Sequence, residues 1–277
     1  MQHVGMRQVL CGLVAAVLLA SAQPVTQFEA ASIKPSANCA GGRGGGGSSP
    51  APGRFSVRCF SAEDYIQAAY SMFADGVSQN PRRMQIFSGP DWGKTDTWDI
   101  EARAGAAPIA QMYGPMLQKL LEDRFHLKIH RETRQLPVYI LTLAKGGPKL
   151  AATKEGSCVP LDLKSMQPPS PGSVRCGSGS VRGNAARTVI DSHGQTVTAL
   201  AAQGFRADLD RPVIDQTGLT GMFDVHLEFA HEGAPAGDLS APSLFTAVQE
   251  QLGLKLTPDK GPVEVLVIDH LERPSEN

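Results

Sequence analysis

Apolar positions along the chain predict a strand followed by a helix, and this pair occurs twice. Residues 55–59 alternate between apolar and polar positions as a half-buried strand does, and residues 188–191 predict the matching strand of the second half. Each segment is followed by a helix-capping residue, Ser61 in the first case and Thr196 in the second, and Asp64 completes an approximate capping box with Ser61. The helical stripes that follow consist of Tyr65, Ile66, Ala69 and Tyr70, and of Leu200, Ala201 and Phe205.

The segments that come next also correspond in pairs. Residues 84–104 and 211–230 each predict a strand, a glycine turn and a second strand. A second helix is predicted in each half by apolar residues at helical spacing, which are Leu117, Leu121 and Phe125, and Leu244, Val248 and Leu252. Two more strands close each half, and a proline opens the last of them; these strands are residues 127–129 and 137–143, and residues 254–256 and 262–268.

Each half therefore predicts the order β-α-β-β-α-β-β. The hairpin-like glycine turns favour an α+β fold of two similar halves, in which helices pack on small mixed sheets. The first repeat covers residues 53–150 and the second residues 185–277, with the shared topology ending near residue 272. Residues 151–184, rich in Gly, Pro and Ser, predict a linker, and residues 23–52 predict an N-terminal strand and a flexible glycine-rich segment.

The stretch Gly89–Thr95, GPDWGKT, raises the question of a phosphate-binding loop. Such a loop has four residues between its first glycine and Gly-Lys-Ser/Thr, but only three separate Gly89 from Gly93. Gly93 also matches Gly218 in the second half, where no lysine follows, and residues 96–104 predict a strand where a P-loop needs a helix. We therefore predict a turn between two strands, with both glycines at positive φ.

The first 22 residues have the pattern of a secretory signal peptide. A positive region at Arg7 precedes the apolar residues 9–20, and Ala20-Ser21-Ala22 fits a cleavage site. The apolar run is shorter than the ~20 residues that a membrane-spanning helix needs. We predict an exported protein, periplasmic or extracellular, that begins near Gln23 and has no transmembrane segment in its mature form.

Charge and cysteine content narrow the function further. The chain is nearly neutral, with 26 Lys and Arg against 27 Asp and Glu, and this argues against binding to nucleic acid. Four cysteines follow the predicted signal, and in an oxidising compartment an even number favours disulfides. Three pairings are open, of which the short separations favour Cys39–Cys59 and Cys158–Cys176.

The ordered motifs resemble a large paralogous family of exported proteins of unknown function from soil acidobacteria. The domain of that family also occurs joined to membrane zinc peptidases of the antibiotic-sensing antirepressor type. The motifs are FEAASIKPS (28–36), GRFSVRC (53–59), SGPDW (88–92), DIEA (99–102), LLEDRFHLKIHRETRQLPVYILTLAKGGPKL (120–150), RPVIDQTGLTGMFDVHLEF (211–229) and SLFTAVQEQLGLKLTPDKGPVEVLVIDHLERPSEN (243–277). The resemblance implies no known activity and assigns no site residue.

Each half is also similar, in the order of its elements, to the short N-terminal domain of secretins and TonB-dependent receptors. Residues 243–269 carry the best copy of this pattern, which ends in a hairpin. Those domains are periplasmic modules for protein interaction or signalling, so the similarity implies a role of that kind.

The sequence His226-x-Glu228-x-x-His231 is the best candidate for a metal site. His226 and Glu228 share one face of a strand, but zinc needs three or four converging ligands. A solvated strand face has the same alternation, and we expect that instead. We therefore predict no metal and no other cofactor.

Catalytic motifs give no firm lead either. His193 lies beside Asp191 and Ser192, but a Ser–His–Asp triad is defined by geometry and not by spacing. The chain has no G-x-S-x-G, S-x-x-K or H-E-x-x-H motif. We therefore predict a non-enzymatic binding or sensing module with an unknown ligand or protein partner. The alternative is a hydrolase or metal-dependent enzyme whose site assembles from distant His, Asp and Glu residues.

A surface between the two halves is the predicted partner site. Its candidate residues are Trp92, Trp98, Leu219 and Phe223, since exposed aromatic residues often anchor partners, although both tryptophans are also candidates for the core. An apolar cleft or an exposed sheet edge between the halves would favour the binding module. A cluster of His and Asp in a deep pocket would favour the enzyme.

Overall fold

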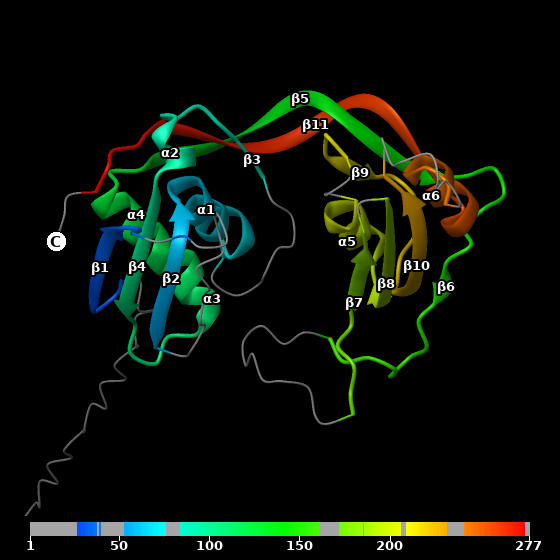
Figure 1. Ribbon diagram of the computed structural model, residues 1–277, viewed down its shortest axis with the longest axis horizontal. Helices are drawn as coiled ribbons and strands as arrows, with labels where there is room; N and C mark the ends of the chain where they lie inside the picture. The colour runs from blue at the N-terminus through cyan, green and yellow to red at the C-terminus, as the bar shows by residue number, and fades with distance from the viewer. Residues whose placement is uncertain are drawn as a thin grey trace, which may run out of the picture.

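The molecule consists of two lobes joined by a long ribbon of two strands (Figure 1). The computed structural model describes residues 27–37, 39, 53–75, 84–160, 172–184, 186–205, 209–231 and 241–274. The predicted signal peptide and most of the glycine-rich segment lie outside these residues. Helices and small sheets are both present, so the predicted α+β class is confirmed.

The first lobe is a three-stranded antiparallel sheet covered by short helices. Its strands follow the order β1-β4-β2, with bounds Ala30–Pro35 for β1, Thr97–Arg103 for β4 and Arg54–Ser61 for β2. Its helices are α1 (Ala62–Ile66), η1 (Gln67–Met72), α2 (Trp92–Thr95), α3 (Ile109–Gln111), η2 (Met112–Met116) and α4 (Leu117–Arg124). The predicted capping box is confirmed: Ser61 Oγ accepts from the N–H of Asp64, whose carboxylate accepts from the N–H of Ser61 at 3.0 Å.

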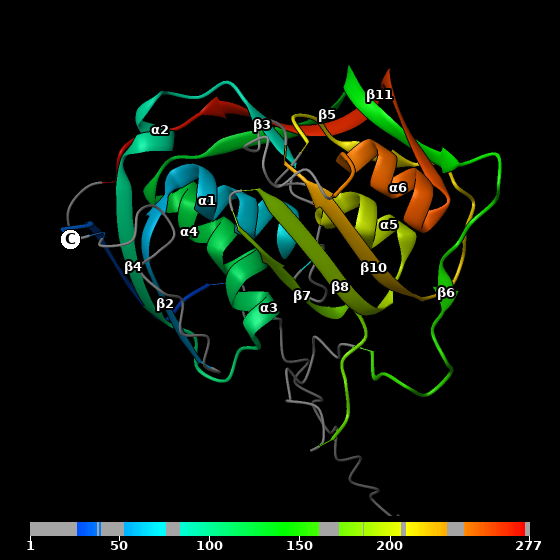
Figure 2. The same ribbon diagram turned by 45° about the vertical axis from the view of Figure 1, so that its right-hand side comes forward.

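The second lobe contains an antiparallel sheet with the order β6-β10-β8-β7 (Figure 2). Its strands are β6 (Ala151–Ala152), β7 (Ser178–Gly183), β8 (Arg187–Gln195) and β10 (Phe223–Ala230), and its helices are α5 (Val197–Ala199), η3 (Leu200–Gly204) and α6 (Leu244–Leu252). The predicted cap at Thr196 is confirmed, since its hydroxyl accepts from the N–H of Ala199 at 3.1 Å.

The ribbon consists of β5 (Lys128–Leu143) and β11 (Leu254–His270), which pair antiparallel along their length. The short strand β3 (Gln85–Phe87) joins β11 in parallel, and β9 (Val213–Asp215) joins β5 in parallel. The resulting mixed sheet has the order β3-β11-β5-β9 and spans both lobes. Two separate strands were predicted at the end of each half, and the structure joins them into one, so no local hairpin forms.

The prolines that predicted a new strand do not interrupt these long strands. The N–H of Tyr139 points to β9, so Pro137, two residues earlier, also faces away from β11. Pro137 lies opposite Lys260, and the same alternation turns Pro262 away from β5. Neither proline removes a hydrogen bond from the β5–β11 ladder, as proline in a strand requires.

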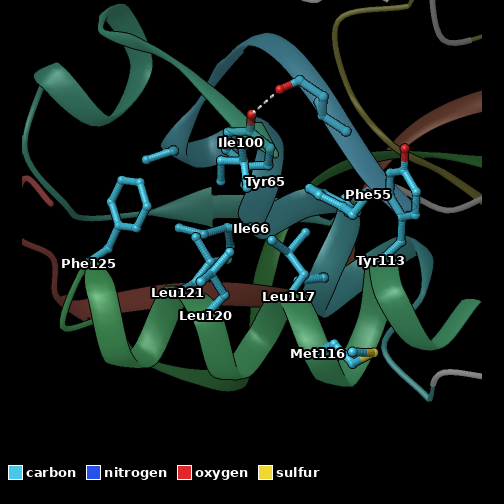
Figure 3. Close-up of a cluster of buried hydrophobic side chains, with 14 of the residues drawn as sticks. Phe55, Tyr65, Ile66, Ile100, Tyr113, Met116, Leu117, Leu120, Leu121 and Phe125 are labelled. Carbon is cyan, nitrogen blue, oxygen red and sulfur yellow. Dashed lines mark hydrogen bonds between the residues drawn. The ribbon is translucent and has the colours of Figure 1, made fainter. Parts of the chain in front are cut away.

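Each lobe has a hydrophobic core that the ribbon completes with residues from the other half. In the first core, α4 directs Leu117, Leu120 and Leu121 towards the sheet (Figure 3). The ribbon adds Leu266 and Ile268, which come from the second half of the sequence. The second core receives Leu141 from the first half, so the two halves exchange strand segments.

The GPDWGKT stretch forms a one-turn helix and not a phosphate-binding loop. Positive φ occurs at Ser88 (63°) and Gly89 (91°), whereas Gly93 lies inside α2 and does not have it. The prediction for Gly93 is therefore wrong: its φ does not require glycine, and the only close neighbour of an added Cβ would be Leu271 Cδ2 at 3.2 Å. The prediction for Gly218 is confirmed, with φ at 68°.

Replacing Lys94 with Ala should leave the free energy of unfolding unchanged within about 0.5 kcal/mol. Lys94 is half-exposed, and its Nζ lies 3.7 Å from Glu63 Oε1, a long contact to a lysine in solvent, and such pairs contribute little. Urea denaturation of both proteins measures the change. Titration with ATP followed by calorimetry is the second measurement, and tight binding that Lys94→Ala abolishes would contradict the assignment as a turn.

Replacing Gly218 with Val should destabilise the fold by about 1–3 kcal/mol. A β-branched residue at a φ of 68° is strained, and since no atom lies within 4 Å of the added Cβ, the backbone is the whole cause. Gly146→Val is the matched control, because its Cβ also meets nothing within 4 Å and its φ is not in the left-handed region. Equal stability of the two variants in urea would refute the argument.

Candidate functional site

A cleft of about 860 Å³ lies between the lobes, beside the ribbon. The first lobe contributes Gln67, Met84 and Gln85 to its lining. The ribbon and the second lobe contribute Ile140, Thr142, Thr198, Ala201, Ala202, Phe205, Leu209, Asp210, Arg211, Pro212, Val213, Ile214, Asp215, Gln216, Thr257, Asp259, Lys260, Gly261 and Pro262. The residues come from seven helices and strands and from the connections beside them, far apart in the sequence, which is why the sequence did not reveal the cleft.

Two π-helical segments, one from each lobe, face this cleft. Gln67 is the first residue of η1, and Ala201 and Ala202 lie in η3. Segments of π-helix are rare and often occur at functional sites. Each follows a capped first turn, so Gln67 is the sixth residue after its N-cap Ser61, and Ala202 is the sixth after Thr196.

Gln67 carries a buried polar atom without a partner in the wall of the cleft. The side chain is 7% exposed, and its Nε2 donates to the carbonyl oxygen of Met84. Its Oε1 is buried and accepts no hydrogen bond. An unpaired buried carbonyl costs about 1–3 kcal/mol, and because this oxygen has no exposed surface, a ligand in the cleft does not reach it in this structure.

The charged residues of the cleft are of both signs. Arg211 donates from Nε and Nη2 to the carboxylate of Asp210 at 3.0 Å each, and this pair lowers the pKa of Asp210. Asp215 accepts from the N–H of Thr217 at 3.0 Å and from the hydroxyl of Thr198 at 2.9 Å. With these carboxylates already paired, the cleft suits a ligand with apolar and hydrogen-bonding groups better than a strongly charged ion.

The four predicted partner residues do not form one surface. Trp98 is 6% exposed and packs edge-on against Phe125 in the first core, so it cannot contact a partner. Trp92 packs partly on the same core beneath the guanidinium of Arg273. The other two, Leu219 and Phe223, pack on the second core. Figure 1 shows α2 and β4, which carry the two tryptophans, in one lobe, and β10, which carries Phe223, in the other.

The predicted metal candidates each contact a different side chain. His226 Nδ1 lies 2.7 Å from Asp191, and its hydrogen bond is the main cause that lowers the pKa of Asp191. Glu228 pairs with Arg187 at 2.7 Å. His231 Nε2 lies 2.9 Å from the hydroxyl of Thr188. Within the described part of the chain, no group of three or more side chains could hold a metal ion.

A second polar cluster connects Ser157, His193 and Asp224 in the order of a catalytic triad. Ser157 Oγ lies 3.0 Å from His193 Nε2, and His193 Nδ1 lies 2.7 Å from Asp224 Oδ1. A hydrogen bond from Thr153 at 2.7 Å is the main cause that lowers the pKa of Asp224. The sequence singled out His193 but paired it with its neighbours, because no spacing indicates partners from other elements.

The hydroxyl of Ser157 is engaged elsewhere. It donates to the carbonyl oxygen of Lys154 at 2.6 Å, so its single proton is not directed at His193. The next residue, Cys158, forms a disulfide with Cys176. The cluster therefore fastens the connection after β6 to strands β8 and β10.

The structure contains the two disulfides that the short separations favoured. Cys39 and Cys59 have a Cα–Cα distance of 5.7 Å, and Cys158 and Cys176 one of 5.0 Å. Among the described residues, no helix is both long and apolar enough to cross a membrane.

By its fold and its cleft, the protein is an α+β protein of an uncharacterised class. The chain is a member of the family described as "Protein of unknown function (DUF3738)", which matches residues 63–271. The match includes the cleft lining and the second lobe, and it begins after β1 and β2, two of the three strands of the first lobe's sheet. No curated protein and no solved structure matches the chain.

Proposed function

We propose that this protein is a non-enzymatic binding or sensing module of the periplasm or cell envelope, and that its ligand binds in the cleft between the lobes. The observation that carries the proposal is the cleft itself, which both lobes and the ribbon line. Its volume of about 860 Å³ falls in the range of ligand sites, roughly 300–1,000 Å³, and such sites commonly lie between two packed bodies.

The lining has the composition that a binding site needs. Apolar walls from Ile140, Phe205 and Ile214 exclude water, and a small number of polar residues, such as Thr142 and Gln216, fix the orientation of a ligand. A ligand held between both lobes would also change how they pack, which is a means of signalling. The resemblance to domains joined to antibiotic-sensing zinc peptidases supports a sensing role. The two disulfides support an oxidising, exported location.

The test uses the mature protein, residues 23–277, as an affinity matrix for cell-envelope extract, with mass spectrometry of what is retained. Thr257→Trp fills the cleft from an exposed position of β11. Lys255→Trp is the matched control, since Lys255 is exposed on the same strand but does not line the cleft. We expect Thr257→Trp alone to lose the retained component. Retention that both variants leave unchanged would remove the cleft as the site.

The Ser157–His193–Asp224 cluster favours a second candidate function, that of a serine hydrolase. Because the hydroxyl of Ser157 donates to Lys154, we propose a structural role for this cluster in preference to catalysis. A fluorophosphonate probe, which reacts with activated serines, decides between the two. We expect no labelling of Ser157. Labelling at Ser157 that His193→Ala abolishes would establish the hydrolase instead.

A further inference from the structure

We propose that the ligand of the cleft is an extended polypeptide segment, which adds as a strand to the free edge of β9. This inference rests on the proposed function and names the class of partner. β9 is the last strand of the sheet β3-β11-β5-β9, so one of its edges pairs with β5 and the other does not. Strand addition to an exposed sheet edge is a common way for proteins to bind peptides.

The hydrogen bonds of β9 show which backbone groups are free. The carbonyl of Pro212 accepts from the N–H of Tyr139 at 2.8 Å, and the N–H of Gln216 donates to the carbonyl of Leu141 at 2.9 Å. In a parallel pair, alternate residues face the partner strand, so Val213 and Asp215 point their N–H and C=O groups to the other side. These four groups have no hydrogen-bond partner within the part of the chain that the structure describes.

The matching place in the first lobe is occupied by side chains. Met84, directly before β3, donates its N–H to Ser71 Oγ at 3.2 Å and accepts from Gln67 Nε2. Gln67 and Ser71 are both buried in η1 and close this edge against further strands. The position of Gln67 relative to its helix cap is that of Ala202 in the second lobe. Ala202 has only a methyl group, so it cannot donate the corresponding hydrogen bond to the carbonyl of Val213. Residue 206, which matches Ser71, lies outside the described residues.

The free edge lies in a protected place. Exposed sheet edges invite pairing with other molecules, and proteins usually cover them. Here eight consecutive residues, 209–216, line the cleft, so the edge of β9 is recessed between the lobes. A single extended segment of about three to five residues matches the length of β9, roughly 10 Å, whereas the edge of a whole sheet needs far more room.

The surroundings of this edge fit a peptide. Successive side chains of an added strand would point alternately to the two faces of the sheet. The small residues Ala201 and Ala202 of η3 line the same cleft. Ile140 and Thr257 are paired on the ribbon and line the cleft as well.

The experiment selects binders from a phage-displayed library of random peptides with the mature protein and measures the binding of synthetic copies. Ala202→Gln supplies the side chain that closes the edge in the first lobe, and Val213→Pro removes only a donor that faces away from β5. We expect each variant to fold, as thermal melting will check. Each should bind about tenfold more weakly than the unaltered protein, the loss of one net hydrogen bond.

Amide exchange measured by NMR gives a readout that steric blocking would not produce. When a peptide binds, hydrogen exchange at the Val213 and Asp215 amides should slow at least tenfold. The exchange rate of the Ile214 amide, which already faces β5, should not change. Peptide binding that leaves Val213 and Asp215 unprotected overturns strand addition. Strand addition is also overturned if the library gives no peptide whose binding is lost in the Thr257→Trp variant. A non-peptide ligand that Thr257→Trp still excludes would leave the proposed function standing.

Discussion

Expressed separately, neither half of the chain will fold, and the two will fold when they are produced together. Residues 23–150 lack Leu266, Ile268 and Leu271, which are buried in the first core. Each such loss costs about 2–5 kcal/mol, so three together approach the whole stability of a typical domain, about 5–15 kcal/mol. Residues 151–277 lose Leu141 from the second core and the whole pairing partner of β11.

Circular dichroism and thermal melting of each fragment, alone and co-expressed, measure this effect. The control is the intact protein with a protease site placed in the predicted linker, between residues 161 and 171. After cleavage both halves are still present, so we expect the cut protein to melt cooperatively near the temperature of the uncut one. A cooperative melt of fragment 23–150 by itself would show that the exchange of strand segments is not needed for folding.

The exchange bears on the predicted duplication. The order of strand, helix with a π-helical turn, strand, strand, helix and long strand occurs in both halves of the described chain. The two copies do not have separate cores, because each core contains residues of the other copy. Whether α6 superposes on α4 with its flanking strands in the same order is the remaining test, and the duplication stays a prediction until that comparison is made.

Features that depend on residues close together in the sequence were predicted correctly. The caps at Ser61 and Thr196 depend on contacts three residues apart, and both are present. The last strands of the two halves, β5 and β11, pair with each other, and the paired residues are more than a hundred positions apart in the sequence. Pro137 and Pro262 are local signals for a break, but their missing N–H groups face away from the partner strand, and only the register reveals that.

The candidate site was hidden for the same reason. In the sequence, Gln67 and Ala202 are ordinary positions on two helices. That one can donate a hydrogen bond and the other cannot becomes important only because the structure places Gln67 against Met84 and brings Ala202 and Val213 to the same cleft. The sequence did predict that a sheet edge between the halves would favour a binding module. It could not identify β9 as that edge, because an edge strand is defined by the neighbour that it lacks.

Replacing Cys39 and Cys59 together with Ala will lower the free energy of unfolding by about 3 kcal/mol. The bridge closes a loop with a sequence separation of 20, and loops of that size restrict the unfolded chain by about this amount. It also holds the chain after β1 against β2, where Cys59 is 2% exposed and its N–H donates to Asp99 at 2.9 Å. The melting temperature should fall by about 6–12 °C.

Cys158→Ala with Cys176→Ala is the matched control. Its loop is of similar length, with a separation of 18, but both cysteines are half-buried at the surface of the second lobe. Because the two loops are of similar length, the lost restriction of the unfolded chain should lower the free energy of unfolding by nearly the same amount in both double variants. The buried position of Cys59 predicts a further loss of stability for the first pair alone. Peptide mapping of the unreduced protein checks the pairing itself. A link from Cys59 to Cys158 or Cys176, or four free thiols after denaturation, would contradict both the pairing and the expected loss of stability.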